Sequence, residues 1–197
     1  MNLPNKLTII RICLTPVFMA AMLIDFPHHY LVALIIFVFA SVTDWLDGYI
    51  ARSRNLITNF GKFLDPLADK MLTTAALIAF LYKGFGVGIA WVLFIVLFRE
   101  FVIASIRLIA VSSVDKKVIA ANIWGKFKTV TQMVAIVLGV AGLYLIETIC
   151  PAINLPEFTK IIVSTSFSTI LWISTFFALF SGVVYLKNNA MYINPNN

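Results

Sequence analysis

The sequence predicts an all-α, polytopic membrane protein with six transmembrane helices and both termini in the cytoplasm. Of its 197 residues, 61% are hydrophobic and 12% are charged. A soluble domain is about half apolar and about a quarter charged. The apolar residues fall into segments of about 20 residues, which is the length that a helix needs to cross a bilayer. Because only short loops separate these segments, we expect residues 1–197 to form a single integral-membrane domain.

The first three segments are bounded by charged and turn-forming residues. The first has Lys6 and Arg11 near its start, as a signal peptide would, but no small-x-small cleavage site follows Ala21, so we expect it to be retained. Pro27 separates it from the second segment. The third ends at a glycine-rich turn. The three segments cover residues 7–26, 31–51 and 60–81.

The last three segments follow that turn, which contains Gly84, Gly86 and Gly88. Since no Lys-Ser/Thr pair follows these glycines, they predict a flexible turn and not a phosphate-binding loop. Pro151 and Pro156 separate the fifth segment from the sixth. The sixth is rich in Ser and Thr without charge, which predicts interhelical packing and hydrogen bonding. The three segments cover residues 87–111, 123–146 and 161–186.

The basic residues predict the orientation of the chain. If the N-terminus is cytoplasmic, the opposite loops hold only Lys83 and Lys160, and all other loop lysines and arginines are cytoplasmic. This excess indicates a multi-pass protein of the cell membrane with both termini in the cytoplasm. The net charge of +6 is scattered, and no basic block reaches five residues. It therefore favours contact with membrane lipids or anionic ligands and excludes a nucleic-acid partner.

Four aspartates lie where the second and third segments approach the cytoplasmic surface: Asp44, Asp47, Asp65 and Asp69. Residues three or four apart share one face of a helix, and a short connection makes the two helices antiparallel neighbours. The carboxylates can therefore converge. Without a counter-ion they would repel one another and take up protons, so a divalent cation is expected. Oxygen ligands favour Mg²⁺, Mn²⁺ or Ca²⁺ over zinc. The only histidines, His28 and His29, are expected at the opposite end as a solvated interfacial pair.

The residues around these aspartates form a specific pattern. The eight fixed positions are Asp44, Asp47, Gly48, Ala51, Arg52, Gly61, Asp65 and Asp69. The pattern resembles the complete signature of the CDP-alcohol phosphatidyltransferase family, with matching spacing at every position. The resemblance implies transfer of a phosphatidyl-type group from a CDP-linked lipid to an alcohol, release of CMP, a divalent metal ion and a homodimer.

The resemblance also implies roles for the eight positions. Asp44, Asp47 and Asp65 resemble metal ligands, for Mg²⁺ or Mn²⁺. Asp69 resembles the residue that both binds metal and deprotonates the acceptor hydroxyl. The residues that match the CDP-lipid pocket are Gly48, Ala51, Arg52 and Gly61. These roles suit phosphatidyl transfer, because a bound metal ion neutralises the diphosphate and a positioned carboxylate acts as general base.

Further basic residues at similar depth predict a pocket for a phosphorylated acceptor. They are Arg11, Lys62, Arg107, Lys126 and Lys128. Arginine and lysine give phosphate charge-assisted hydrogen bonds, although each could instead extend to lipid headgroups. Arg99 and Glu100 lie deeper in the fourth segment. Since adjacent helical residues point in different directions, we expect them to have separate partners and Glu100 to pair with Arg107.

Two short stretches bear on the acceptor alcohol. Residues 2–12 and 125–133 are similar to the branch of the family that uses CDP-diacylglycerol and glycerol 3-phosphate. Inositol phosphate would also fit a cationic pocket, and serine is a further alternative acceptor. A divalent-cation transporter is the alternative from another class, because membrane carboxylates also mark ion pathways. A transporter would not explain the four non-acidic signature positions, and the outer halves of the segments are almost purely apolar.

Overall fold

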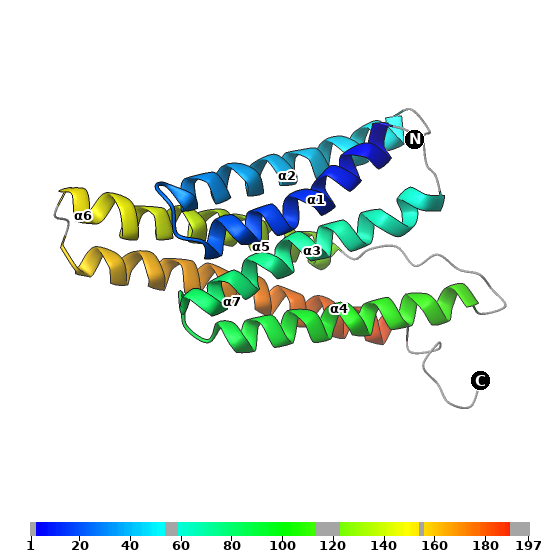
Figure 1. Cartoon of the computed structure of the whole chain (residues 1–197). Helices are drawn as coiled ribbons and strands as arrows, with labels where there is room; N and C mark the ends of the chain where they lie inside the picture. Colours follow the sequence, from blue (N-terminus) through cyan, green and yellow to red (C-terminus); the bar gives the residue numbers. More distant parts are fainter. Residues whose placement is uncertain (1–2, 54–58, 113–122, 154–155, 190–197) are drawn as a thin grey trace. The chain divides into compact units, whose positions relative to one another are not determined.

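The computed structural model describes residues 3–53, 59–112, 123–153 and 156–189, and these residues contain helices and no strand (Figure 1). The all-α prediction is thus confirmed for the part of the chain that is described. Six long helices correspond to the six predicted segments, and a short π-helix, η1, joins α5 to α6. The elements are α1 (Leu3–Leu23), α2 (His29–Ser53), α3 (Asn59–Lys83), α4 (Ile89–Ser112), α5 (Ile123–Tyr144), η1 (Leu145–Ile149), α6 (Cys150–Ile153) and α7 (Phe158–Asn188).

Within the described residues, four stretches of helix are long and apolar enough to cross a membrane. They are Asn5–Leu23, Ile89–Ile106, Ile123–Ala152 and Phe158–Asn188. The apolar stretch His29–Asp44 of α2 is shorter. The first half of α3 carries Asp65, Asp69 and two lysines, which make it more polar than the other helices. Because the charges of α2 and α3 belong to the predicted site, hydropathy alone does not mark these two helices as spans.

The chain divides into two compact units, which are described separately. The first comprises Met1–Val87 and Ile136–Phe167, and the second comprises Gly88–Ala135 and Ser168–Asn197. Helices α5 and α7 each contribute one part to each unit.

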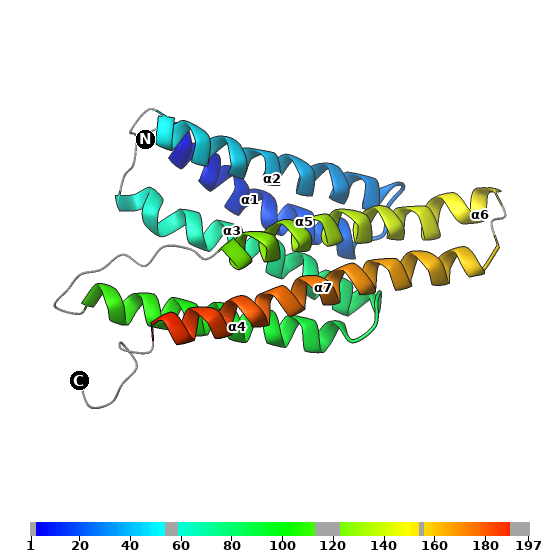
Figure 2. The same cartoon turned by 180° about the vertical axis from the view of Figure 1, so that it is seen from behind.

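Within the first unit, α1 packs against both α2 and α3. Helix α1 runs parallel to α3 and antiparallel to α2 (Figures 1 and 2). The interface between α1 and α2 contains the fully buried rings of Phe18 and Phe37, whose centroids are 5.5 Å apart. As a result, the N-terminal ends of α1 and α3 and the C-terminal end of α2 lie at one end of the unit. These are the ends that carry the predicted site residues.

The first unit also contains a close approach of three helices at Gly139 of α5. A Cβ atom at this position would lie 2.5 Å from the Phe167 ring of α7 and 2.7 Å from the Phe80 ring of α3. The centroids of these two rings are 4.7 Å apart. Only glycine leaves room for both rings, so this position fixes how closely the helices can pack.

The turns at the other end of the first unit agree in part with the predictions. Gly84 and Gly86 have φ angles of 63° and 103°, which favour glycine, and this confirms the glycine turn. His28 is exposed, as expected. His29 is only 12% exposed, and its Nδ1 lies 3.0 Å from the carbonyl oxygen of Ala21. The expectation of a fully solvated pair is therefore wrong for His29, because the turn folds its ring back against α1.

The second unit consists of α4 and the adjoining parts of α5 and α7. Its apolar core includes Ile103 and Ile106 of α4 and Tyr185 of α7, with Val102 packed against them. A polar network lies within the same three helices and is described below.

Candidate functional site

The two described carboxylates of the signature lie on α2 and α3. Asp44 of α2 accepts a hydrogen bond from Nη1 of Arg11, which lies on α1. The Arg11 side chain is 1% exposed, whereas Asp44 is 35% exposed. A buried guanidinium thus holds a carboxylate that reaches the surface of the protein. The packing of α1 against α2 creates this ion pair between residues that are 33 positions apart.

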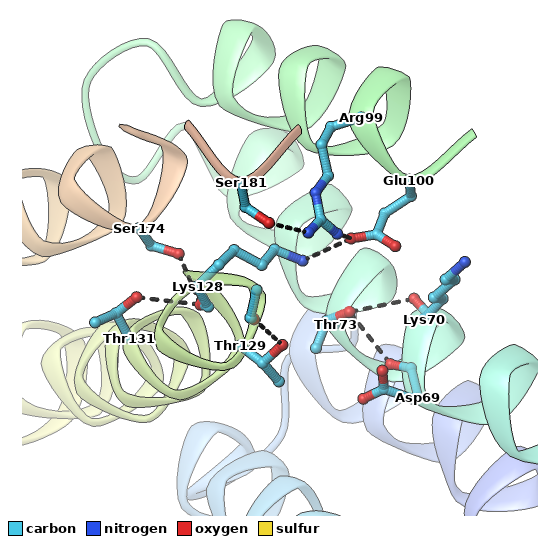
Figure 3. A network of polar contacts seen from close by, with 11 residues as sticks. Asp69, Lys70, Thr73, Arg99, Glu100, Lys128, Thr129, Thr131, Ser174 and Ser181 are labelled. Atoms are coloured by element: carbon cyan, nitrogen blue, oxygen red, sulfur yellow. Dashed lines mark hydrogen bonds and ion pairs between the residues drawn. The ribbon is translucent and has the colours of Figure 1, made fainter. Parts of the chain in front are cut away.

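Asp69 lies one helical turn after Pro66, in a regular part of α3. The hydroxyl of Thr73 donates to the carbonyl oxygens of Asp69 and Lys70, at 3.2 and 3.3 Å (Figure 3). Pro66 is the eighth residue of α3, so it lies beyond the first turn and removes one backbone hydrogen bond of the helix. The Asp69 side chain is half-buried. The backbone therefore presents Asp69 from a rigid helix and not from a loop.

The other signature side chains lie outside the described residues, although their backbones are helical. They are Asp47, Gly48, Ala51 and Arg52 in α2, and Gly61 and Asp65 in α3. The side chain of Lys62, a predicted acceptor residue, also lies outside them. The charged ends of α2 and α3 lie at the same end of the unit, and the two described signature carboxylates, Asp44 and Asp69, are oxygen ligands of the kind that Mg²⁺ prefers. Among the described residues, no three His, Cys, Asp or Glu side chains lie close enough together to hold a metal ion.

The second unit contains three charged side chains in contact, Arg99, Glu100 and Lys128, which we call the charge cluster. Oε1 of Glu100 accepts hydrogen bonds from Arg99 Nη1 at 2.6 Å and from Lys128 Nζ at 3.0 Å (Figure 3). The three side chains are 12%, 16% and 8% exposed, respectively. The cluster thus holds two cations and one anion, all largely buried.

The charge cluster corrects the prediction that Arg99 and Glu100 have separate partners. Adjacent residues leave a helix in different directions, but the long arginine side chain folds back to its neighbour. Arg99 also donates from Nη2 to the hydroxyl of Ser181 on α7, at 2.9 Å. The predicted partner of Glu100, Arg107, has its side chain outside the described residues, so that pairing remains a prediction.

Small residues around Arg99 make room for it. A Cβ atom at Gly125 of α5 would lie 3.3 Å from Arg99 Nη2, and one at Gly182 of α7 would lie 3.3 Å from Arg99 Cγ. Sequence reasoning attached no role to Gly182 or Ser181. The only available signal was the hydroxyl-rich pattern of the sixth segment, which predicted interhelical hydrogen bonds without naming their partners. The hydrogen bond that Arg99 donates to Ser181 confirms that prediction.

The two predicted acceptor lysines of α5 differ in their surroundings. Lys128 is 7% exposed and belongs to the charge cluster, whereas Lys126 is exposed. This difference follows from helical geometry, because residues two apart do not share a face. Arg11 is the one acceptor candidate of the first unit with a described side chain, and it contacts Asp44.

Comparison with known proteins agrees with the signature. The sequence pattern of the CDP-alcohol phosphatidyltransferase family matches residues 1–184. A CDP-diacylglycerol–glycerol-3-phosphate 3-phosphatidyltransferase of Bacillus subtilis is 40% identical over 95% of both chains. A protein of the same name from Rickettsia bellii is 36% identical over 94% of both chains. A cardiolipin synthase (CMP-forming) of Oryza sativa is 34% identical over 95% of this chain and 57% of its own length. The chain belongs to the CDP-alcohol phosphatidyltransferase family.

Proposed function

We propose that this chain transfers the phosphatidyl group of CDP-diacylglycerol to glycerol 3-phosphate, giving phosphatidylglycerol phosphate and CMP for phospholipid biosynthesis. The observation that carries the proposal is the eight-position signature on α2 and α3, whose charged ends lie at the same end of the first unit (Figure 1). Full-length relatives named for this reaction support the choice of acceptor.

The donor side of the reaction uses the residues of α2 and α3. Asp44, Asp47, Asp65 and Asp69 would hold Mg²⁺ or Mn²⁺, which when bound neutralises the diphosphate and the charge that develops at phosphorus. Gly48, Ala51, Arg52 and Gly61 line the position of the CDP group. The carboxylate of Asp69 takes the proton of the acceptor hydroxyl as that oxygen attacks the phosphatidyl phosphorus, and the bond to CMP breaks.

The acceptor side of the reaction requires cations for a second phosphate. Lys128 supports this assignment best, because it is buried beside Arg99 and both side chains contact Glu100. The other candidates from the sequence are Arg11, Lys62, Arg107 and Lys126. Of these, Arg11 contacts Asp44, and we assign it to that carboxylate. Charge-assisted hydrogen bonds from such residues are about twice as strong as neutral ones.

The direct test supplies purified protein with CDP-diacylglycerol and one acceptor at a time, and measures CMP release. We expect glycerol 3-phosphate to support turnover, and inositol phosphate and serine to support little. EDTA should stop the reaction, and Mg²⁺ or Mn²⁺ should restore it. Turnover with serine but not with glycerol 3-phosphate would disprove the choice of acceptor. Divalent-cation flux into proteoliposomes without CMP release would instead favour a transporter.

The cationic pocket is tested by removing single charges. Arg107→Ala and Lys128→Ala should each lower kcat/KM for glycerol 3-phosphate roughly ten- to hundredfold, because a hydrogen bond to a charged group is worth about 1.5–3 kcal/mol. The change should appear mainly in the KM of the acceptor, with little change for CDP-diacylglycerol. Steady-state kinetics with each substrate varied in turn checks this, and Lys160→Ala is the matched control because Lys160 is exposed near Glu157. An unchanged acceptor KM in both variants would disprove the proposal that these residues form a cationic pocket for the acceptor phosphate.

We further propose that the chain is a homodimer in the cell membrane with its active site facing the cytoplasm. The excess of basic residues in the loops at the site end supports this orientation. Labelling of single cysteines introduced at the two ends of α1 tests it, and the mass of the purified protein tests the dimer.

A further inference from the structure

The face of α5 that carries Lys128 also carries Gln132, because residues four apart share a face of a helix. Gln132 is 1% exposed, and neither its Oε1 nor its Nε2 has a hydrogen-bond partner among the described residues. Most buried polar side-chain atoms are hydrogen-bonded, so an unpartnered buried amide requires an explanation. The side-chain amide of Gln132 therefore offers one hydrogen-bond donor group and one acceptor to a bound molecule.

Three other polar side chains of α5 and α7 have hydrogen-bond partners within the protein. The hydroxyl of Thr129 donates to the carbonyl oxygen of Gly125 at 3.1 Å, and that of Thr131 donates to Phe127 at 2.7 Å. On α7, the hydroxyl of Ser174 donates to the carbonyl oxygen of Lys128 at 3.2 Å (Figure 3). These three hydroxyl groups have partners within the protein, whereas the amide of Gln132 has none among the described residues.

Lys128 and Gln132, the two side chains on this face of α5, differ in the hydrogen bonds that they can form. Lys128 can only donate hydrogen bonds, and it lies with Arg99 beside Glu100. A phosphate group accepts charge-assisted hydrogen bonds from such a lysine. The amide of Gln132 both donates and accepts, so it matches a hydroxyl group. Their Cβ atoms are about 5–6 Å apart on the helix, so a small molecule with a phosphate and a nearby hydroxyl could contact both.

We propose that Gln132 binds the secondary hydroxyl of glycerol 3-phosphate while Lys128 binds its phosphate. The inference rests on the proposed function. In that reaction the primary hydroxyl attacks the phosphatidyl phosphorus, so the secondary hydroxyl is the one that remains for recognition. Nε2 donates to the oxygen of this hydroxyl and Oε1 accepts its proton. Gln132 thus selects the acceptor without taking part in the bond-making step.

The test compares glycerol 3-phosphate with 3-hydroxypropyl phosphate, which keeps the phosphate and the primary hydroxyl but lacks the secondary one. We expect the wild type to prefer glycerol 3-phosphate by about tenfold or more in kcat/KM, because sites built to bind a hydroxyl reject analogues without it. In Gln132→Met, kcat/KM for glycerol 3-phosphate should fall about tenfold or more, and kcat/KM for the analogue should stay within about twofold. The preference should therefore disappear.

The matched control is Thr131→Val, which removes a hydroxyl that is bonded to its own helix and should leave the preference intact. The ratio of the kcat/KM values for the two acceptors, measured on one preparation, does not depend on the fraction of the protein that is folded. Gln132→Met should also be at least as heat-stable as the wild type, because methionine has a similar volume and replaces an amide without a partner.

Each remaining outcome decides against the inference. If Gln132→Met keeps the full preference, the amide binds water or nothing. If the variant is less stable and loses activity equally with both acceptors, Gln132 is structural. If the wild type releases no CMP with glycerol 3-phosphate, the proposed function itself fails, and this inference fails with it.

Discussion

Replacing Asp44, Asp47 or Asp65 with asparagine is expected to lower the rate of CMP release roughly a thousandfold or more. The change removes a negative charge and a metal ligand while it preserves side-chain volume. A bound metal ion contributes several kcal/mol of transition-state stabilisation, and each 1.36 kcal/mol corresponds to about a tenfold change in rate. The measurement is CMP release as a function of Mg²⁺ concentration, together with metal binding by calorimetry.

Asp69→Asn should be as inactive but for a different reason. It removes the base that accepts the proton, so binding of CDP-diacylglycerol should be partly retained. The matched control is Asp25→Asn. Asp25 lies in the turn after α1, is 83% exposed and contacts Lys83 at 3.1 Å, at the end of the first unit away from the site. Full turnover in Mg²⁺ by any one of the four site variants would falsify the assignment.

Arg11→Ala is expected to lower activity about ten- to hundredfold through its effect on Asp44. Residues that orient metal ligands typically have effects of this size. Because Arg11 is 1% exposed and donates to Asp44, its removal takes away a buried group that helps to hold this carboxylate in position. We expect the Mg²⁺ concentration that gives half-maximal activity to change, while the KM for glycerol 3-phosphate stays the same.

The same kinetic measurements distinguish a role of Arg11 in orienting Asp44 from the role predicted from the sequence, which is binding of the acceptor phosphate. If Arg11 binds the acceptor phosphate, the KM for glycerol 3-phosphate will rise in Arg11→Ala and the Mg²⁺ dependence will not move. Arg11→Lys is the informative companion. It keeps the charge but not the planar guanidinium, so a partial recovery with the wild-type Mg²⁺ dependence supports the ion pair with Asp44.

The sequence by itself determined the helices and the family. Runs of apolar residues gave the long helices because a bilayer-length hydrophobic segment has few other stable structures. The predicted second segment, 31–51, corresponds to His29–Ser53, and the third, 60–81, to Asn59–Lys83. The signature aspartates could be recognised because their spacing is local to two helices. The glycine turn could be recognised because positive φ angles are favourable chiefly for glycine.

The C-terminal end of the fifth predicted helix could not be located from the local sequence pattern alone. The sequence placed this end near residue 146, before Pro151, because proline usually interrupts a helix. In the structure, α5 continues through η1 and into α6, so that helical backbone extends to Ile153. Pro151 is the second residue of α6 and lies inside this continuous helical run, so it removes one backbone hydrogen bond without ending the helix.

Only the tertiary structure decided which charged side chains meet. Helical periodicity assigns a residue to a face, but its partner comes from whichever helix packs against that face. Arg11 could be assigned to a lipid headgroup, a substrate phosphate or a carboxylate until α1 was seen to pack on α2 beside Asp44. Likewise, Glu100 meets Lys128 only because α4 and α5 bring residues 28 positions apart into contact. Gln132 is recognisable as an unpartnered amide for the same reason, since burial is a property of the assembled helices and not of the local sequence.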